Sequence, residues 1–224
     1  VWALRGKETI GITMIFQGPF SADVHPVEAC SMIEAFRRQT ILAGSIIWEH
    51  LNPGDSAIDG TAGAGEDTLM MARRVGPEGR VYAFDIQGEA IARTRSLLAS
   101  QGVEQPVRLY HLGHESLGSL PEISGDPRIR GIMFNLGYLP GGDHAIVTRC
   151  ETTIAALKGA LGVLAADGVM TVCVYGHQEG LSEAQGVEAW CSALGKGIDV
   201  HRIETINHQN SPVLYLIKKA RDVK

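Results

Sequence analysis

A chain of 224 residues with 45% hydrophobic residues is long enough for one sizeable core but short for two domains. Its formal net charge of −5 argues against a broad basic surface for nucleic acid, and no apolar run reaches membrane-spanning length. The four cysteines and eight histidines show no metal-ligand spacing. We therefore expect buried thiols in a reducing compartment and no metal site.

The pattern of apolar residues predicts alternating helices and strands. We expect helices over residues 30–50, 67–75, 88–100, 152–164 and 183–194, and strands over residues 56–59, 80–85, 107–111, 129–135, 169–175, 199–207 and 213–218. This alternation is typical of an α/β fold with helices on both faces of a mostly parallel sheet. The short link 208–212 favours an antiparallel pair. The sequence thus predicts a Rossmann-like, mostly parallel seven-stranded sheet with an antiparallel C-terminal strand.

The N-terminal residues are the least regular part of the sequence. Residues 1–39 contain turn signals but no pattern that we can place in the sheet. We therefore expect an N-terminal extension followed by a single domain over residues 40–224. The sequence begins with Val1 rather than Met, so an organellar location directed by a targeting segment stays an alternative. Otherwise we expect a cytoplasmic protein.

A glycine-rich turn follows the first expected strand, over residues 59–65. Glycines let a backbone approach a nucleotide-like ligand closely, and Asp85, which ends the next strand, can accept hydrogen bonds from ribose hydroxyls. The glycine order differs from the G-x-G-x-x-G of dinucleotide folds, and Asp59 would repel a pyrophosphate. A cofactor that carries positive charge fits better. The turn resembles the D-x-G-x-G-x-G loop of class I S-adenosylmethionine-dependent methyltransferases, with Thr61 in place of the first glycine.

The ends of the expected strands carry further polar residues. Parallel sheets bind ligands at the carboxyl ends of their strands, so we expect Asp59, Asp85, the loop 111–116, Asn135 and Tyr175 to share one rim.

Asn135 stands at the end of the fourth strand, before a tight turn and the aromatic residue Tyr138. This order resembles the N-P-P-Y loop of amino-methyltransferases, in which the Asn carbonyl accepts hydrogen bonds from an amine. Methyl transfer depends on positioning of donor and acceptor, and a site with few charges favours the neutral amine that attacks. An asparagine that only caps the turn is the alternative.

A wider resemblance covers about residue 40 to the end. The matching residues are 59–68, 82–87, 134–143, 146–148, 152–153, 176–177 and 212–214. In these residues the chain is similar to the putative ribosomal-RNA methylase family, also known as YtqB. Family members are associated with tRNA, where they methylate the 5-aminomethyl group of a modified wobble uridine. The resemblance implies an S-adenosylmethionine-dependent methyltransferase that acts on the anticodon region of tRNA. It implies no membrane partner, and a homodimer stays an alternative to a monomer.

The resemblance also implies roles for individual residues. Residues 60–65 would wrap the methionine portion of the cofactor, Asp85 would hold the ribose, and His114 would lie near the adenine. His177 would form a wall of the site, and Asp143 would attract the acceptor ammonium or take its proton. The implied cofactor-binding residues are Asp59, Gly60, Thr61, Ala62, Gly63, Gly65, Asp67, Thr68, Asp85, Ile86, Gln87, His114 and Asn135. The implied catalytic residues are Asn135, Tyr138, Asp143 and His177.

Three other functions stay open at this point. A small-molecule amine would serve as acceptor with the same cofactor, and it fits the acidic net charge. A noncatalytic partner protein could retain only the cofactor-binding fold. A dinucleotide-dependent oxidoreductase is disfavoured by Asp59 and the order of the glycines.

Overall fold

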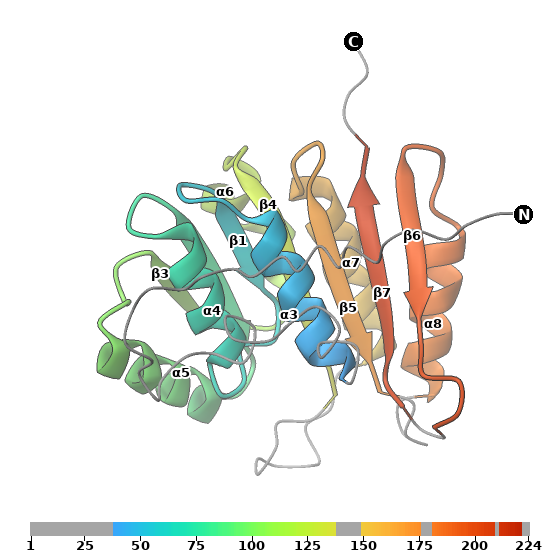
Figure 1. Cartoon of the computed structure of the whole chain (residues 1–224), viewed down its shortest axis with the longest axis horizontal. Helices are drawn as coiled ribbons and strands as arrows, with labels where there is room; N and C mark the ends of the chain where they lie inside the picture. The colour runs from blue at the N-terminus through green and yellow to red at the C-terminus, as the bar shows by residue number, and fades with distance from the viewer. Residues whose placement is uncertain (1–37, 138–148, 176–180, 209–210, 221–224) are drawn as a thin grey trace, which may run out of the picture.

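A computed structural model describes residues 38–137, 149–175, 181–208 and 211–220. Within them, helices lie on both faces of a central sheet (Figure 1). The strands are β1 (Ser56–Asp59), β2 (Arg80–Asp85), β3 (Val107–His111), β4 (Ile129–Leu136), β5 (Val169–Val174), β6 (Ile198–Ile203) and β7 (Val213–Lys219). The helices are α3 (Gln39–His50), α4 (Glu66–Val75), α5 (Gly88–Gln101), the 3₁₀ helix η1 (His114–Ser119), α6 (Pro121–Ser124), α7 (Cys150–Val163) and α8 (Leu181–Ser192).

The seven strands follow the order β3-β2-β1-β4-β5-β7-β6. The first five strands along the chain are parallel, and β7 pairs antiparallel with both β5 and β6. The order reverses between β1 and β4, which lie side by side in the sheet although they are far apart in the sequence. In open α/β sheets such a switch point is where ligands bind. The predicted α/β class and the antiparallel C-terminal strand are confirmed.

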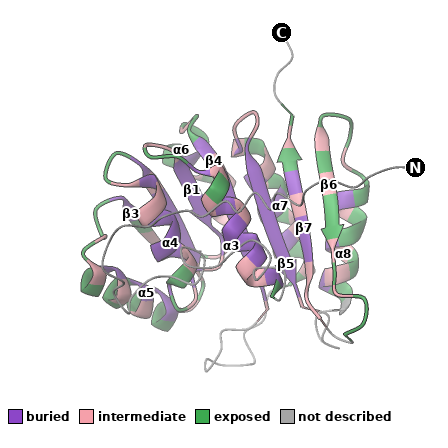
Figure 2. Ribbon diagram, viewed as in Figure 1, coloured by how far each residue is buried: buried purple, intermediate pink, exposed green. Residues whose placement is uncertain are grey.

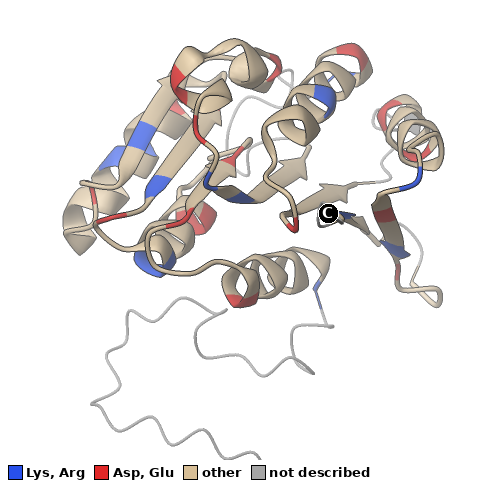
Figure 3. Ribbon diagram, turned by 90° about the horizontal axis from the view of Figure 1, so that it is seen from above, with Lys and Arg blue, Asp and Glu red and all other residues tan. Residues whose placement is uncertain are grey.

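Side chains that alternate along each strand divide the core into two layers. Ala57 and Met133 face one layer with α3 and α4, whereas Ile58 and Phe134 face the other with η1 and α7. The view from above shows these helices on opposite sides of the sheet, with acidic and basic residues interspersed around the described part of the chain (Figure 3). Figure 2 shows the buried residues concentrated along the central strands, as expected of strands covered on both faces.

Most expected element boundaries lie within two residues of those observed. The structure describes the expected helix over residues 30–50 only from Gln39 onwards. In this described part, Ile47 is fully buried. Residues 111–116 were expected to form a loop, but η1 begins within them at His114, and α6 was not predicted either. The helices η1 and α6 are too short to show helical periodicity. Cys173 and Cys191 are buried thiols as expected, whereas Cys150 is only partly buried, so that expectation was too broad.

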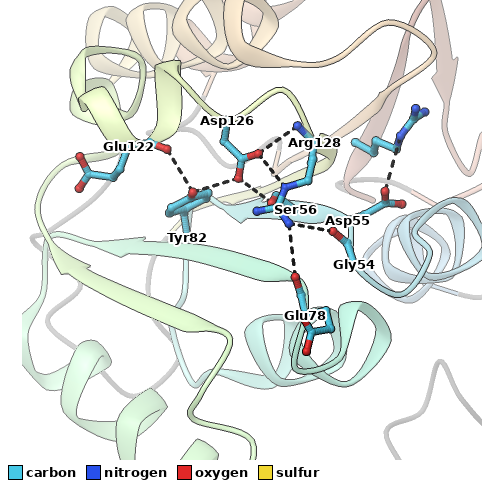
Figure 4. A network of polar contacts seen from close by, with 9 residues as sticks. Gly54, Asp55, Ser56, Glu78, Tyr82, Glu122, Asp126 and Arg128 are labelled. Carbon is cyan, nitrogen blue, oxygen red and sulfur yellow. Dashed lines mark hydrogen bonds and ion pairs between the residues drawn. The ribbon is translucent and has the colours of Figure 1, made fainter.

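A polar network fixes the amino edge of the sheet, opposite the switch-point rim (Figure 4). The Asp126 carboxylate accepts hydrogen bonds from Ser56 Oγ at 2.6 Å, from Tyr82 Oη at 3.0 Å and from the Arg128 backbone N–H at 3.0 Å. Burial alone raises the pKa of Asp126, but these hydrogen bonds outweigh it and lower that pKa below its ordinary value. The network therefore ties β1, β2 and the start of β4 together far from the glycine turn.

Candidate active site at the carboxyl edge of the sheet

The glycine turn is held by hydrogen bonds of its own backbone N–H groups. Thr61 N donates to Asp59 Oδ1 at 3.1 Å, Ala62 N donates to the Phe84 carbonyl at 2.8 Å, and Gly63 N donates to Asp85 Oδ2 at 2.9 Å. These three bonds attach the turn to β1 and β2. The loop is thus preorganised, which lowers the entropy lost when a ligand binds.

Two glycines in this turn occupy positions where a side chain has no room. Gly65, which precedes α4, has a φ of 91°, and a Cβ there would lie 2.8 Å from Thr94 Cα. A Cβ on Gly60 would lie 2.2 Å from Cε1 of the buried Phe134. Thr94 and Phe134 were not among the predicted site residues. They are recognised only once α5 and β4 are known to pack against the turn.

Asp59 lies beneath the turn and is almost completely buried. Its Oδ2 accepts a hydrogen bond of 2.5 Å from Thr68 Oγ1 in the first turn of α4. Burial raises the pKa of Asp59 above its ordinary value, and the nearby Asp85 acts in the same direction, although the bonds from Thr68 and Thr61 oppose it. A buried acid of this kind favours a cationic ligand over a phosphate, because a cation stabilises its ionised form.

Asp85, Ile86 and Gln87 lie at the carboxyl end of β2, beside the glycine turn. Asp85 Oδ1 accepts a hydrogen bond from Gln87 N at 2.8 Å, which fixes the carboxylate at the rim. The Ile86 side chain is 61% exposed beside it. A half-buried carboxylate next to an exposed apolar side chain suits a ribose joined to a flat base, because the carboxylate can accept from the ribose hydroxyls while the apolar side chain contacts the base.

His114, the first residue of η1, lies against the glycine turn. It is buried, its Nδ1 lies 3.3 Å from the Gly60 carbonyl oxygen, and its ring meets Phe134 edge-on at 5.8 Å. Burial lowers the pKa of His114 below its ordinary value, although Gly60 and nearby acids oppose the shift. Burial therefore favours the neutral imidazole, which braces the turn rather than supplying a charge.

Asn135 is tied to the glycine turn and to α4 at the same time. Its backbone N–H donates to Thr61 Oγ1 at 2.8 Å, and its side-chain Nδ2 donates to Asp67 Oδ2 at 2.6 Å. Its Oδ1 is buried and has no hydrogen-bond partner in the part of the chain that the structure describes. Burial raises the pKa of Asp67, and the neighbouring Asp59 and Glu66 raise it further, while the bond from Asn135 opposes them.

The structure brings together most of the predicted site residues. Those on the common rim are Asp59, Gly60, Thr61, Ala62, Gly63, Gly65, Asp67, Thr68, Asp85, Ile86, Gln87, His114 and Asn135, joined by the contacts given above or by their places in the same segments. Tyr138, Asp143 and His177 lie outside the described residues. The contact between Asp67 and Asn135 was not predicted, because 68 residues separate them.

Within the described residues, no group of three or more His, Cys, Asp and Glu side chains is gathered as metal ligands would be. Among the same residues, no helix is both long enough and apolar enough to span a membrane.

Several features of this rim fit S-adenosylmethionine. The close-packed turn and the acids Asp59 and Asp67 suit the cationic methionine portion, while Asp85 and Ile86 suit the nucleoside. The unpartnered Asn135 Oδ1 is an acceptor for an N–H group of a ligand, since buried polar atoms are rarely left unpaired.

Comparison with known proteins gives the same class of chemistry. A sequence model of the family described as "Putative rRNA methylase" matches residues 81–219. A protein of Arabidopsis thaliana named "tRNA (mnm(5)s(2)U34)-methyltransferase, chloroplastic" is 37% identical over 199 residues, which cover 82% of this chain and 70% of that protein.

Two solved structures are similar over almost their whole length. A putative rRNA methylase from Clostridium thermocellum is 37% identical with a TM-score of 0.77, covering 81% of this chain and 97% of that one. A putative methyltransferase from Streptococcus mutans, solved in complex with SAH, is 29% identical with a TM-score of 0.72, covering 81% and 98%. SAH is the product that S-adenosylmethionine leaves after methyl transfer.

Proposed function

Because this chain belongs to the rRNA methylase family and is an S-adenosylmethionine-dependent methyltransferase, we propose that its acceptor is the 5-aminomethyl group of the wobble (2-thio)uridine of tRNA, which it converts to the 5-methylaminomethyl form. The name of the Arabidopsis thaliana relative, which describes a methyltransferase of this nucleotide, supports the assignment. The observation that carries the amine acceptor is the buried, unpartnered Asn135 Oδ1 at the end of β4.

The residues around Asn135 account for how an amine is oriented. The Asn135 carbonyl accepts an N–H of the substrate and so directs the nitrogen lone pair towards the cofactor. The cofactor, when bound, supplies a methyl group on a sulfonium, and displacement from it needs an aligned, neutral amine. The contacts of Asn135 with Thr61 and Asp67 fix this acceptor relative to the cofactor turn, so that alignment is set before the substrate arrives.

The finer roles belong to the same proposal. Residues 60–65 wrap the methionine portion, Asp85 holds the ribose, and Ile86 and Gln87 flank the adenine. Tyr138, Asp143 and His177 are the further catalytic residues of this proposal: His177 as a residue of the site wall, and Asp143 to attract the acceptor ammonium or take its proton.

We further propose the setting in which the enzyme works. It recognises the anticodon region of tRNA, acts as a monomer or homodimer, and functions in the cytoplasm or in an organelle. Residues 40–224 form one methyltransferase domain, preceded by an extension over residues 1–39.

The acceptor is tested by supplying the protein with S-adenosylmethionine and tRNA that bears the aminomethyl uridine. Nucleoside mass spectrometry should show one added methyl group, whereas tRNA without the aminomethyl group should stay unmodified. Methylation of free small amines without activity on tRNA would replace this proposal with a small-molecule methyltransferase. Loss of activity on every acceptor, with SAH still bound, would favour the noncatalytic alternative.

Asn135→Ala tests the role of the site in the same assay. It should slow methyl transfer while leaving SAH affinity within about threefold, because its proposed contact is with the amine. Asn52→Ala is a matched control. Asn52 is exposed, and its side-chain amide donates a hydrogen bond to the His50 carbonyl. Equal rates for the two variants would remove Asn135 from the acceptor site.

A further inference from the structure

We propose that Asp67 is a positioning residue, which holds the side-chain amide of Asn135 with its carbonyl directed to the acceptor amine. This inference rests on the proposed function, because it requires Asn135 to receive the substrate. It gives Asp67 a role towards the acceptor instead of the cofactor contact expected from the sequence.

The amide of Asn135 has two ends of nearly equal size and opposite hydrogen-bonding character. Nδ2 would repel the N–H groups of an amine, whereas Oδ1 accepts from them. Nothing in the shape of the amide selects one end, so a fixed partner must do so. Asn135 Nδ2 donates to Asp67 Oδ2 at 2.6 Å, and this hydrogen bond directs Oδ1 the other way.

The opposite orientation would place the Asn135 carbonyl oxygen against the carboxylate of Asp67. An ionised Asp67 would repel that oxygen, whereas a protonated Asp67 would donate a hydrogen bond to it. The orientation observed, in which Nδ2 donates to Asp67 and Oδ1 stays unpaired among the described residues, is therefore the one favoured when Asp67 is ionised, and the hydrogen bond from Asn135 itself opposes the rise of the Asp67 pKa that burial causes. An N–H group of the substrate then donates the hydrogen bond that Oδ1 lacks among the described residues.

The two contacts of Asn135 come from the glycine turn and from α4, which directly follows it. Asp67 stands in the first turn of α4, two residues after Gly65, and α4 buries Met70 and Met71 against the sheet. Thr61 holds the Asn135 backbone N–H from the turn itself. The rotamer of Asn135 is thus fixed by packed secondary structure, as alignment of two reactants requires.

The competing explanation is that Asp67 only binds the cofactor, whose methionine portion is cationic. That role predicts weaker cofactor binding in an Asp67 variant and an unchanged rate at saturating cofactor. Positioning predicts the reverse: cofactor affinity is kept and the rate falls. The two explanations therefore separate in one set of measurements.

The test uses the full chain with S-adenosylmethionine and aminomethyl-bearing tRNA in single-turnover reactions. Asp67→Ala should lower the rate about 10- to 100-fold, the loss typical of a misplaced reacting group, while the Kd for SAH stays within about threefold. Asp67→Asn should give an intermediate rate, since its amide still offers an acceptor to Asn135 Nδ2 but also offers a donor to Oδ1. Glu78→Gln, which changes an exposed acid beyond the C-terminal end of α4, should match the wild type.

A double-mutant cycle decides whether Asp67 acts through Asn135. In the Asn135→Ala background, Asp67→Ala and Asp67→Asn should cause no further loss of rate. Additive losses, or a loss confined to cofactor affinity, would overturn the inference while leaving the proposed acceptor in place. If Asn135→Ala alone has no effect, the proposed contact with the amine fails and the inference fails with it. Circular dichroism checks folding, and the Asp67→Asn pair supplies the cycle if Asp67→Ala does not fold.

Discussion

Replacing Gly65 with alanine tests how closely the glycine turn, residues 59–65, packs against α5. Gly65 and Gly102 both adjoin helices and both have positive φ, 91° and 65° respectively. An alanine in such a conformation costs about 1–2 kcal/mol at either position. The two sites differ in their surroundings: a Cβ on Gly65 would lie 2.8 Å from Thr94 Cα, whereas one on Gly102 would have nothing within 4 Å.

The close approach at Gly65 is to backbone, which cannot move aside by changing a rotamer. Forcing one extra methyl group into a packed region costs about 1–3 kcal/mol more. Gly102→Ala should therefore lower the free energy of unfolding by about 1–2 kcal/mol, and Gly65→Ala should lower it by a further 1–3 kcal/mol or so. Gly65→Ala should also weaken SAH binding, because the turn must shift, whereas Gly102→Ala should bind SAH normally.

Urea unfolding followed by circular dichroism measures both free energies, and calorimetry measures the affinities. The difference between the two variants is the informative quantity, because the shared effect of positive φ cancels in it. Equal losses of stability would show that the turn and α5 are not in contact at Gly65. A normal SAH affinity in Gly65→Ala would show that the turn does not hold the cofactor.

The remaining predictions concern two acids at opposite edges of the sheet. Asp85→Ala should weaken SAH binding by about 1–3 kcal/mol in calorimetry, through loss of charge-assisted hydrogen bonds to ribose, and unchanged affinity in a folded variant would remove Asp85 from the site. Asp126→Ala should lower the free energy of unfolding by about 1–3 kcal/mol at pH 7 and leave SAH affinity unchanged. Since the folded protein lowers the pKa of Asp126, its contribution is present above the ordinary carboxyl pKa of about 4 and is lost as pH falls through the folded value, so the variant should approach the wild type in acid. A stability difference that grew towards low pH would contradict that sign.

The parts of the site that the sequence predicts are those whose chemistry is local. The acid and the glycines of the turn fall within seven residues, and Asp85 is recognised because it ends the next apolar strand. The packing of Thr94 against the turn, by contrast, depends on how α5 returns over the sheet. The contact of Asp67 with Asn135 depends on β4 lying next to β1, and hydrophobic periodicity does not specify the order of strands.

The polar contacts beneath the turn form a closed ring, and the ring explains why Thr61 stands where related turns have glycine. Thr61 N donates to Asp59, Thr61 Oγ1 accepts from Asn135 N, Asn135 Nδ2 donates to Asp67, and Thr68, the next residue of α4, donates back to Asp59. A glycine at position 61 would open the ring, because it has no hydroxyl to accept the β4 N–H. In-line transfer requires the methyl donor and the acceptor to be fixed relative to each other, and each element of this ring faces one of them in the proposed site. In the proposed site, Thr61 therefore fixes Asn135, the residue that we propose receives the acceptor amine.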